Sequence, residues 1–553
     1  MAEDRVSRPD VPTDMTDCDA VVIGSGPGGA AATEVLTEAG WSVVMLEKGR
    51  NHLIDTAAPY DFRYHFSNDE IAQTRRYLLG PDPLLEPRVY RDTVGEVNNL
   101  PSTVGGGGVH ADAKLPRFRE EDFALATTRG GIEGARVEDW PLGYDELEPH
   151  YAAVERSFGV AGEPTNPFAA PRRDPFPMPP GPDMPFALVS GAAAERLGLH
   201  PYRAPTGVNS VDYDGRPPCA DCGYCGGYGC PLHAKGDPIS SLQRALRTGR
   251  LELRSDAYVT EILRDASGKK ATGVRYLDLT KYPEPGVAQV SARVVIVAGG
   301  AFETPRLLLR CGIGGDNVGR YLTYHYQTFT VGIFDRDTGG DRGRSVTHLH
   351  DDLMIDTPEM RTVAADAGLP WVRGGTVEHG AGTHPISEAL NYGRGAHHLP
   401  SMQDSSLRRR LWAFTVQGED LPQATNRVEL DGSVKDAWGF PAGRVTYVPH
   451  RHELVASEYA QQLHERVMRE AGAEATFSAT SPRGDDPPES RHVMGTARMG
   501  TNPATSVVSP MQHLWDVDNV YVCDSSVFVT SSGYNPTLTL AALSHRAAKG
   551  LVS

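Results

Sequence analysis

The sequence predicts a mixed fold in which an α/β unit of Rossmann type is combined with an α+β unit built on an antiparallel sheet. Residues 21–50 have the order strand, glycine turn, helix and second strand. Residues 321–430 change to alternating apolar and polar positions, a period of two that is typical of antiparallel strands. Residues 520–543 return to a strand followed by a helix, so the end of the chain is expected to rejoin the first unit.

The N-terminal unit has the pattern of a dinucleotide-binding turn. A short apolar strand, residues 20–23, leads into Gly24, Gly26 and Gly29 in G-x-G-x-x-G spacing. Gly24 permits the tight turn, Gly26 lets backbone N–H groups approach a pyrophosphate, and Gly29 lets helix and strand pack closely. Glu47 follows about twenty residues on, where an acid accepts from a ribose 2′-hydroxyl. An acid there disfavours a 2′-phosphate, so the motif predicts FAD or NAD rather than NADP. A purely structural glycine turn is the alternative.

Composition and charge disfavour several classes of protein. The 553 residues suggest about three to four domains. Lys and Arg number 54 against 71 Asp and Glu, a net charge of −17, with no basic block, so nucleic acid and anionic membranes are poor partners. No apolar run reaches membrane-spanning length, so no transmembrane segment is expected. Residues 1–19 lack the apolar core of a secretory signal, and 7 cysteines are few, as in a reducing compartment. We therefore expect a cytoplasmic protein.

These patterns divide the chain into three expected segments. Residues 17–325 form the nucleotide-binding unit, residues 326–480 the substrate unit, and residues 481–553 the return to the first unit. The middle segment is rich in histidine but lacks i,i+4 pairs and a carboxylate framework, so we expect most of these side chains at the polar surface and regard a metal site as the weaker interpretation. The histidines are His348, His350, His379, His384, His397 and His398.

Four consecutive glycines, residues 105–108, precede His110. A run of glycines packs poorly in a core, but it lets the backbone lie against a flat, bulky group. A flexible linker is the alternative, although linkers rarely run directly into an apolar stretch. On its own pattern His110 is a loop histidine.

Four cysteines lie close together, with the spacing C-x2-C-x2-C-x4-C. They are Cys219, Cys222, Cys225 and Cys230. Disulfides are disfavoured by the expected compartment, and a zinc ion usually takes two C-x2-C arms separated by a longer loop. An iron–sulfur cluster tolerates denser spacing, and the glycines between the cysteines would let the backbone wrap it. The pattern favours an iron–sulfur cluster, followed by zinc or an all-thiol structural loop.

Several further stretches, spread over nearly the whole chain, form a joint pattern with the N-terminal motif. They are Val104-Gly105-Gly106, residues 300–314 (GAFETPRLLLRCGIG), Asn317-Val318-Gly319-Arg320, His492-x-x-Gly495-Thr496 and the Asp524…Asn535-Pro536 ending. Together they resemble the glucose-methanol-choline (GMC) flavoprotein oxidoreductases. Cys311 departs from the family's second signature, which usually has Ser, and no effect on the mechanism is expected. Residues 139–151 (DWPLGYDELEPHY) and the cysteine segment look most like gluconate-dehydrogenase-type large subunits and related sugar dehydrogenases.

The resemblance implies FAD, with a sheet-based substrate unit over the flavin ring. It implies oxidation of a primary or secondary alcohol, such as a sugar, glycoside or polyol, by hydride transfer to flavin N5. An alcohol is a poor hydride donor until its hydroxyl proton leaves, so a base must reach that oxygen, and neutral histidine fits. By the match His492 is this base, and Asn535 orients the hydroxyl and supports the developing alkoxide. Without the resemblance, these two residues would be interpreted as a turn histidine and a helix cap.

The resemblance also assigns contacts to the cofactor. His110 stands where some members link histidine covalently to the flavin, Val259 matches a backbone contact to adenine, and Asp524 matches a polar contact to the ribityl chain or pyrophosphate. The expected cofactor-binding residues are Gly24, Ser25, Gly26, Gly28, Gly29, Glu47, Lys48, Val104, Gly105, Gly106, His110, Val259, Asp524, Asn535, Pro536 and Thr537.

Alternative functions follow from the same residues. One is a lyase of this fold that holds FAD without redox turnover and uses His492 as a plain acid–base. Another is an oxidase that uses O2 and has a purely structural cysteine loop, and a third is a redox carrier subunit. A cluster at the cysteines would carry electrons from reduced FAD to an external acceptor. The sequence leaves open the substrate and whether the acceptor is O2, a quinone or a protein.

Overall fold

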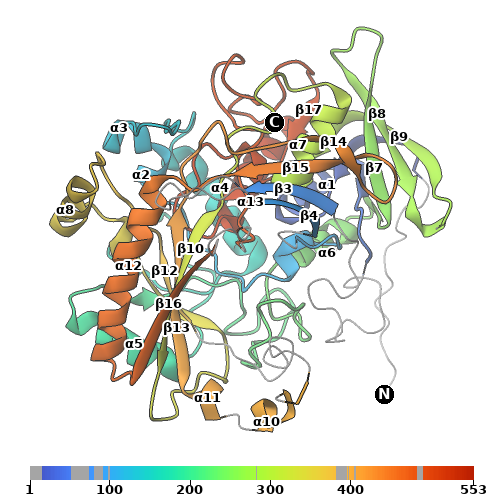
Figure 1. Ribbon diagram of the computed structural model, residues 1–553. Coiled ribbons are helices and arrows are strands. Elements are labelled where there is room, and N and C mark those ends of the chain that lie inside the picture. The colour runs from blue at the N-terminus through green and yellow to red at the C-terminus, as the bar shows by residue number, and fades with distance from the viewer. Residues whose placement is uncertain are drawn as a thin grey trace, which may run out of the picture.

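The computed structural model describes residues 15–51, 74–79, 91–96, 100–281, 283–380, 395–396, 398–403, 406–481, 488 and 490–553 (Figure 1). None of the helices in this described part of the chain is both long enough and apolar enough to cross a membrane.

A largely parallel sheet forms the first part of the structure. β1 lies between β2 and β9, and the register places Ala20 beside both Val43 and Val294. The other edge of β9 pairs with β8 of the β7–β8 hairpin and, in parallel, with β17. The strands are β1 (Asp17–Ile23), β2 (Val43–Leu46), β6 (Leu251–Arg254), β7 (Ala257–Arg264), β8 (Ala271–Asp278), β9 (Gly286–Val297) and β17 (Val520–Val522). Val21 and Val22 are fully buried like Ala20, as in a strand covered on both faces.

Helices from both ends of the chain pack beside this sheet. α1 packs against α6 and α13, and α13 packs against α4. They are α1 (Pro27–Glu38), α4 (Tyr144–Phe158), α6 (Pro238–Arg247) and α13 (Thr537–Val552). Because β17 and α13 lie against β9 and α1, the first and last segments of the chain share one layered structure.

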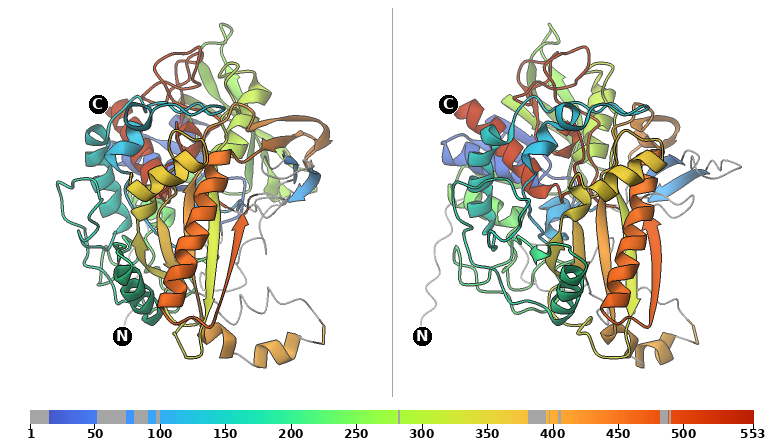
Figure 2. Two further views of the ribbon diagram at one scale, coloured as in Figure 1. Left: turned by 60° about the vertical axis from the view of Figure 1, so that its left-hand side comes forward. Right: turned by 90° about the vertical axis from the view of Figure 1, so that its left-hand side faces the viewer.

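An antiparallel sheet forms the second part, in the order β16-β10-β13-β12-β11-β5. It consists of β5 (Tyr202–Arg203), β10 (His325–Ile333), β11 (Val346–His350), β12 (Val377–Gly380), β13 (Leu411–Glu419) and β16 (Ala475–Ser481). Trp412, Phe414 and Val416 of β13 share a buried core with residues of α5 (Pro185–Arg196) and α12 (Arg451–Glu470), which lie along one face of the sheet (Figure 2). Side chains alternate along a strand, so the positions between these three face the opposite side.

A small third sheet joins distant segments. Its order is β14-β15-β3-β4, with β15 parallel to β3. The strands are β3 (Thr74–Leu79), β4 (Arg91–Glu96), β14 (Arg427–Lys435) and β15 (Pro441–Tyr447). α7 (Gly300–Cys311) packs against β14 and β15 and also against β7 of the first sheet. The three sheets confirm the predicted combination of α/β and α+β structure. The segment bounds 17–325, 326–480 and 481–553 stay a prediction, and β5 pairs with β11 across the first of them.

The remaining helices of the described residues are short. They are η1 (Gly106–Val109), α2 (Glu120–Phe123), α3 (Leu125–Arg129), η2 (Leu279–Lys281), η3 (Asp352–Met354), α8 (Pro358–Asp366), α10 (His398–Gln403), α11 (Ser406–Arg409) and η4 (Ser525–Val527).

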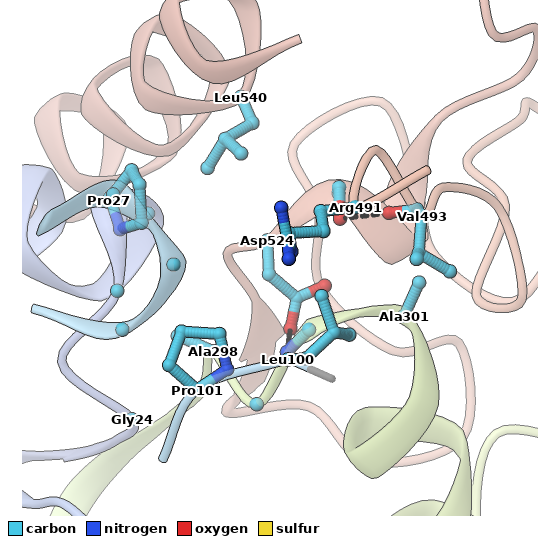
Figure 3. Close-up of a pocket in the computed structure, with 18 of the residues that line it drawn as sticks. Gly24, Pro27, Leu100, Pro101, Ala298, Ala301, Arg491, Val493, Asp524 and Leu540 are labelled. Atoms are coloured by element: carbon cyan, nitrogen blue, oxygen red, sulfur yellow. Dashed lines mark hydrogen bonds between the residues drawn. The ribbon is translucent and has the colours of Figure 1, made fainter. Parts of the chain in front are cut away.

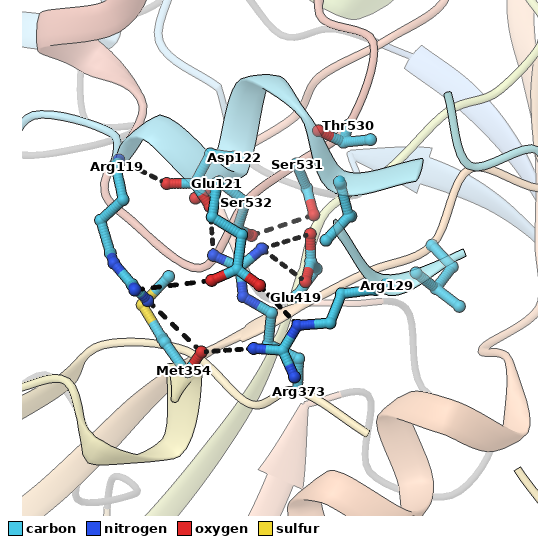
Figure 4. A network of polar contacts seen from close by, with 12 residues as sticks. Arg119, Glu121, Asp122, Arg129, Met354, Arg373, Glu419, Thr530, Ser531 and Ser532 are labelled. Carbon is cyan, nitrogen blue, oxygen red and sulfur yellow. Dashed lines mark hydrogen bonds and ion pairs between the residues drawn. The ribbon is translucent and has the colours of Figure 1, made fainter. Parts of the chain in front are cut away.

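A buried ion network links the two main parts (Figure 4). Arg373 is fully buried and pairs with Asp122 of α2 and with Glu419 at the end of β13, 3.3 Å away. The backbone N–H of Arg373 donates to Nε2 of His452 on α12 at 3.0 Å. One guanidinium therefore neutralises a carboxylate of α2 and a carboxylate of β13.

The expectation that the histidines of the middle segment lie at the surface is wrong for two of them. His350 and His379 are fully buried, because they face α5 and α12 rather than the opposite side of the sheet. His350 Nδ1 and His379 Nε2 are 2.8 Å apart, and His379 Nδ1 lies 2.8 Å from the Ser190 hydroxyl. His464 of α12 lies against this pair, 5.5 Å from the His350 ring. His384 and His397 lie outside the described residues.

This histidine cluster is expected to make the protein sensitive to acid. Burial lowers the pKa of His350 to about 4 and holds those of His379 and His464 well below the usual value. The unfolded chain binds protons below its histidine pKa of about 6.5, whereas the folded chain does not until lower pH. The stability that these residues contribute is therefore complete above about pH 6.5 and is lost as pH falls toward 4.

Replacing His464 with phenylalanine tests this expectation. Neither ring nitrogen of His464 has a hydrogen-bond partner among the described residues, so a ring of similar shape removes a group that must stay neutral without removing a bond. The urea midpoint of His464→Phe should fall less between pH 7 and pH 5 than that of the unaltered protein. An equal fall in both proteins would contradict the assignment.

Candidate active site

A cavity of about 570 Å³ runs from the glycine turn after β1 to the antiparallel sheet. Figure 3 shows Gly24 and Pro27 on one side of it and Arg491 and Val493 on the other, with Asp524 between them. The predicted site residues that line it are Gly24, Ser25, Gly26, Gly28, Glu47, Lys48, Gly106, His110, Val259, His492, Asp524, Asn535, Pro536 and Thr537. Gly29, Val104 and Gly105 are not among the lining residues. One cavity thus brings together residues from both ends of the chain.

The glycines of the turn are required by close backbone contacts. A Cβ on Gly28 would lie 1.9 Å from the carbonyl oxygen of Cys523, and one on Gly24, where φ is +100°, would lie 2.4 Å from that of Ala298. A Cβ on Gly29 would lie 2.1 Å from the Gly24 oxygen, so this residue packs the helix onto the turn instead of facing the cavity. Gly26 differs, because a Cβ there would meet nothing within 4 Å. Its backbone is therefore open to a ligand at the N-terminus of α1, where N–H groups favour a phosphate.

Glu47 fixes the shape of the turn as well as lining the cavity. Its Oε2 accepts from Ser25 N at 2.9 Å and from the Ser25 hydroxyl at 2.6 Å, and its Oε1 accepts from Gly49 N at 2.9 Å. The Ser25 oxygen in turn accepts from Gly105 N at 2.9 Å. Burial raises the pKa of the Glu47 carboxyl, and the hydrogen bonds oppose this rise. The chain Glu47–Ser25–Gly105 therefore ties the turn to the glycine loop.

The glycine loop is held against the cysteine segment. Gly105, the residue before η1, has φ +90°, a backbone conformation that favours glycine. His110 Nδ1 lies 3.0 Å from the Gly227 carbonyl oxygen, and Gly227 N donates to the His110 oxygen at 2.8 Å. Lys235 joins both segments, since its ammonium lies 2.7–3.1 Å from four backbone oxygens, those of Val109, Ala111, Cys225 and Tyr228.

The four cysteines of that segment are not assembled into a metal site. Among the residues that the structure describes, no three His, Cys, Asp or Glu side chains are grouped so as to hold a metal ion. All four are free thiols, and burial raises the pKa of Cys219 to about 11 and of Cys225 to about 12. The thiols, as the structure places them, therefore do not form the iron–sulfur or zinc site that the spacing suggested.

Asp524 and the start of α13 form the cavity wall beside the turn. Each carboxylate oxygen of Asp524 accepts two hydrogen bonds, at 2.5–2.9 Å. Oδ2 accepts from Gly300 N and from the Thr304 hydroxyl. Oδ1 accepts from the backbone N and the hydroxyl of Ser526. Burial raises the pKa of this carboxyl against those bonds. Asp524 therefore joins α7 to η4 and holds the wall in place.

His492 contacts a second histidine at the far end of the cavity. Its Nδ1 lies 2.9 Å from Nδ1 of His325, the first residue of β10, and the rings are nearly perpendicular, at 84°. A bridge between Met494 and Thr323 holds the two segments together. The pKa of His492 is well below the usual value, because the half-buried ring is shielded from water and lies near His325, Lys114 and Arg491.

Asn535 ends a polar network on the cavity face of the sheet. Its Nδ2 donates to Glu378 Oε1 at 3.1 Å, and Gln417 Nε2 donates to the same oxygen at 3.0 Å. Lys114 donates to Glu378 Oε2 at 2.7 Å and to Asp112 at 3.1 Å. The Asn535 Oδ1 is buried and has no partner among the described residues. Glu378 thus accepts one N–H of the Asn535 amide and fixes which end of the amide carries the nitrogen.

Sequence reasoning missed part of this network. The residues are Asp112, Lys114, His325, Gln327, Glu378 and Gln417. Lys114 carried a weak signal, since it stands four positions after His110. Asp112 lies in the same loop as Lys114, and the other four residues lie on strands, whose sequence shows only that positions alternate.

Comparisons with known proteins agree with this arrangement. Two family models, both described as GMC oxidoreductase, match residues 189–327 and 422–544. The chain is 30% identical to 2-methyl-1,2-propanediol dehydrogenase of Mycolicibacterium austroafricanum over 97% of this chain and 95% of that protein. It is 28% identical to the gluconate 2-dehydrogenase flavoprotein of Pantoea cypripedii over 98% and 94% of the two chains.

Solved structures share the fold at lower identity. The crystal structure of pyridoxine 4-oxidase from Mesorbium loti superimposes with a TM-score of 0.62 at 16% identity, covering 96% of this chain and 99% of that one. The sequence match extends over nearly the whole length and includes the segments that form the cavity, so the chain belongs to the GMC oxidoreductase family.

Proposed function

We propose that His492 is the base that removes the hydroxyl proton of the substrate, and that Asn535 holds that hydroxyl, in the FAD-dependent alcohol oxidation that this enzyme performs. One observation carries the proposal. His492 and Asn535 line the same cavity as the glycine turn and Glu47, so a base and an amide lie at one end of a space whose other end has the features of a nucleotide site.

The cavity residues fit FAD. The open Gly26 backbone suits the pyrophosphate, Glu47 suits the adenosine ribose, and the predicted adenine contact, Val259, lines the same space. FAD, when bound, supplies the hydride acceptor for the reaction. The residues of this chain bind the substrate and remove its hydroxyl proton.

His492 and Asn535 have different roles at the hydroxyl group of the substrate. A lowered pKa keeps His492 neutral at physiological pH, so its ring can accept the hydroxyl proton. The hydroxyl has a single proton, which goes to His492, so Asn535 holds the hydroxyl oxygen by donating an amide N–H to it. An amide has two N–H donors and Glu378 takes one, so the other is left to support the alkoxide.

The substrate is proposed to be a small polyhydroxylated molecule. Gln327, Gln417, Glu378 and Lys114 line the end of the cavity beside His492, and buried polar groups of this kind reject ligands that leave them unpaired. The names of the two relatives, a propanediol dehydrogenase and a gluconate dehydrogenase, support the same class.

The electron acceptor and the cysteine segment stay open to experiment. No step of the proposal passes through an iron–sulfur cluster, because the thiols are not grouped to hold one. Iron and acid-labile sulfide analysis of anaerobically purified protein tests the sequence prediction, and a stoichiometric amount of both would restore it. The cytoplasmic location expected from the sequence also stays a prediction.

Anaerobic flavin reduction against a panel of diols, polyols, sugars and simple alkanols tests the proposed function. We expect bleaching of the flavin spectrum by a polyhydroxylated member of the panel and little by alkanols of similar length. Conversion of a substrate without bleaching would favour the lyase alternative. Faster reduction by the alkanols would overturn the substrate class.

A further inference from the structure

Among the residues that the structure describes, the Nδ1 of His492 contacts another histidine and not a carboxylate. The partner of its Nδ1 is the Nδ1 of His325, and the side chain of His325 is fully buried. Two ring nitrogens 2.9 Å apart form a hydrogen bond only if one carries a proton and the other a lone pair. The protonation of His325 therefore decides which nitrogen of His492 is left to face a substrate.

The carbonyl oxygen of Ser531 indicates which ring nitrogen of His325 carries the proton. His325 Nε2 lies 3.3 Å from the Ser531 carbonyl oxygen, and a carbonyl can only accept, so Nε2 carries the proton. Burial lowers the pKa of His325 to about 4, so the ring is neutral and its Nδ1 holds the lone pair. His492 Nδ1 must then donate, which leaves the lone pair of His492 on Nε2.

The acceptor for His325 is itself held firmly. The Ser531 hydroxyl donates to the Asp420 carbonyl oxygen and accepts from Asp420 N, both at 2.9 Å. Asp420 directly follows β13, whose last residue, Glu419, pairs in register with His325. The carbonyl, the His325 ring and the His492 ring are thus positioned from one end of the antiparallel sheet.

We propose that His325 is a positioning residue that holds His492 in the tautomer with an unprotonated Nε2, the form that can accept the substrate proton. This inference rests on the proposed function of His492. In this relay a neutral imidazole occupies the place that a carboxylate often takes beside a catalytic histidine. It orients the ring without adding a negative charge, while Lys114 and Arg491 lie nearby as positive charges.

Two substitutions at position 325 separate the hydrogen bonds from the ring. In His325→Gln the amide oxygen can accept from His492 Nδ1 and the amide N–H can donate to Ser531, so both bonds persist. In His325→Leu neither bond can form. We expect the limiting rate of anaerobic flavin reduction to stay within about tenfold in His325→Gln and to fall about 100-fold or more in His325→Leu, within the range of general-base effects.

Nitrogen-15 NMR of labelled holoenzyme gives a reading that does not depend on turnover. The His492 signals are assigned by difference from His492→Ala. In the unaltered enzyme we expect a protonated Nδ1 and an unprotonated Nε2, kept in His325→Gln and replaced by a mixture of tautomers in His325→Leu. A proton on Nε2 of His492 in the unaltered enzyme overturns the proposal even if His325→Leu fails to fold.

The remaining outcomes are also decisive. FAD content and the thermal midpoint show whether each variant is folded. Equal loss of rate in folded His325→Gln and His325→Leu would mean that the ring acts by packing, and the proposal would be wrong. If His492→Ala is slow and His325→Leu is normal, only this inference fails. If His492→Ala reduces flavin at the usual rate, the proposed function fails with it.

Discussion

Replacing His492 with alanine is expected to lower the limiting rate of flavin reduction by alcohol about 10²–10⁴-fold, the usual contribution of a positioned general base. The ring lines the cavity beside the polar network of Asn535 and Glu378, and its lowered pKa keeps it neutral. The proposed FAD contacts, the glycine turn and Glu47, lie at the other end of the cavity, so the flavin content should not change.

The pH dependence of the unaltered enzyme follows from the same group. A protonated ring cannot act as a base, and the pKa of His492 lies well below the usual value of 6.5 because of burial and the nearby His325, Lys114 and Arg491. The rate of flavin reduction should therefore be level through neutrality and fall only at pH well below 6.5. A rate that halves near pH 7 would contradict this assignment.

Stopped-flow absorbance of anaerobic enzyme and substrate measures both effects. His200→Ala is a matched control, because the His200 side chain is 53% exposed and pairs with Asp352 outside the cavity. The control should keep the normal rate and pH profile. A His492→Ala enzyme with full flavin content and a normal rate would remove His492 from the reaction.

The parts of the site that could be predicted from the sequence are those whose determinants lie close together in the chain. The turn between β1 and α1 needs Gly24 and Gly28, because the backbone at Ala298 and Cys523 comes too close for a side chain. These glycines can be recognised in the local sequence. The alternation of Trp412, Phe414 and Val416 likewise gives one face of β13. His492 and Asn535 entered through family resemblance, since neither has a local signal of catalysis.

The rest of the site depends on register, which local sequence does not specify. Glu378 pairs in register with Thr415 and reaches the cavity, whereas its neighbour His379 faces the helices. Shifting such a pairing by one residue exchanges the two faces of a strand. The same uncertainty explains why His350 and His379 were expected at the surface. The cysteine spacing was misleading for a related reason, because spacing constrains how far thiols can reach and not whether they converge.

Replacing Arg373 with methionine is expected to lower the free energy of unfolding by about 3–5 kcal/mol, as when one partner of a buried ion pair is removed. Arg373 is fully buried, and its loss would leave the carboxylates of Asp122 and Glu419 without their cation (Figure 4). Methionine has a similar length, so the loss of stability measures the missing charge more than the missing volume. Urea unfolding followed by flavin fluorescence and circular dichroism measures it. Arg361→Met is the control, since Arg361 is 65% exposed and pairs with Asp356, and the stability of this variant should stay close to that of the unaltered protein.

The pH dependence of the Arg373→Met loss distinguishes missing charge from poor packing. Burial already raises the pKa of Glu419 to about 7, and Arg373 limits that rise. An acid with a raised folded pKa contributes stability that is complete below its unfolded pKa of about 4.3 and is lost as pH rises through the folded pKa. Without the guanidinium the folded pKa rises further, so the loss extends to higher pH. The variant should be closer to the unaltered protein at pH 5 than at pH 8, whereas a packing defect would cost the same at both. An equal deficit would therefore show that Arg373 holds α2 and β13 together by its shape, and that the two carboxylates find compensation elsewhere.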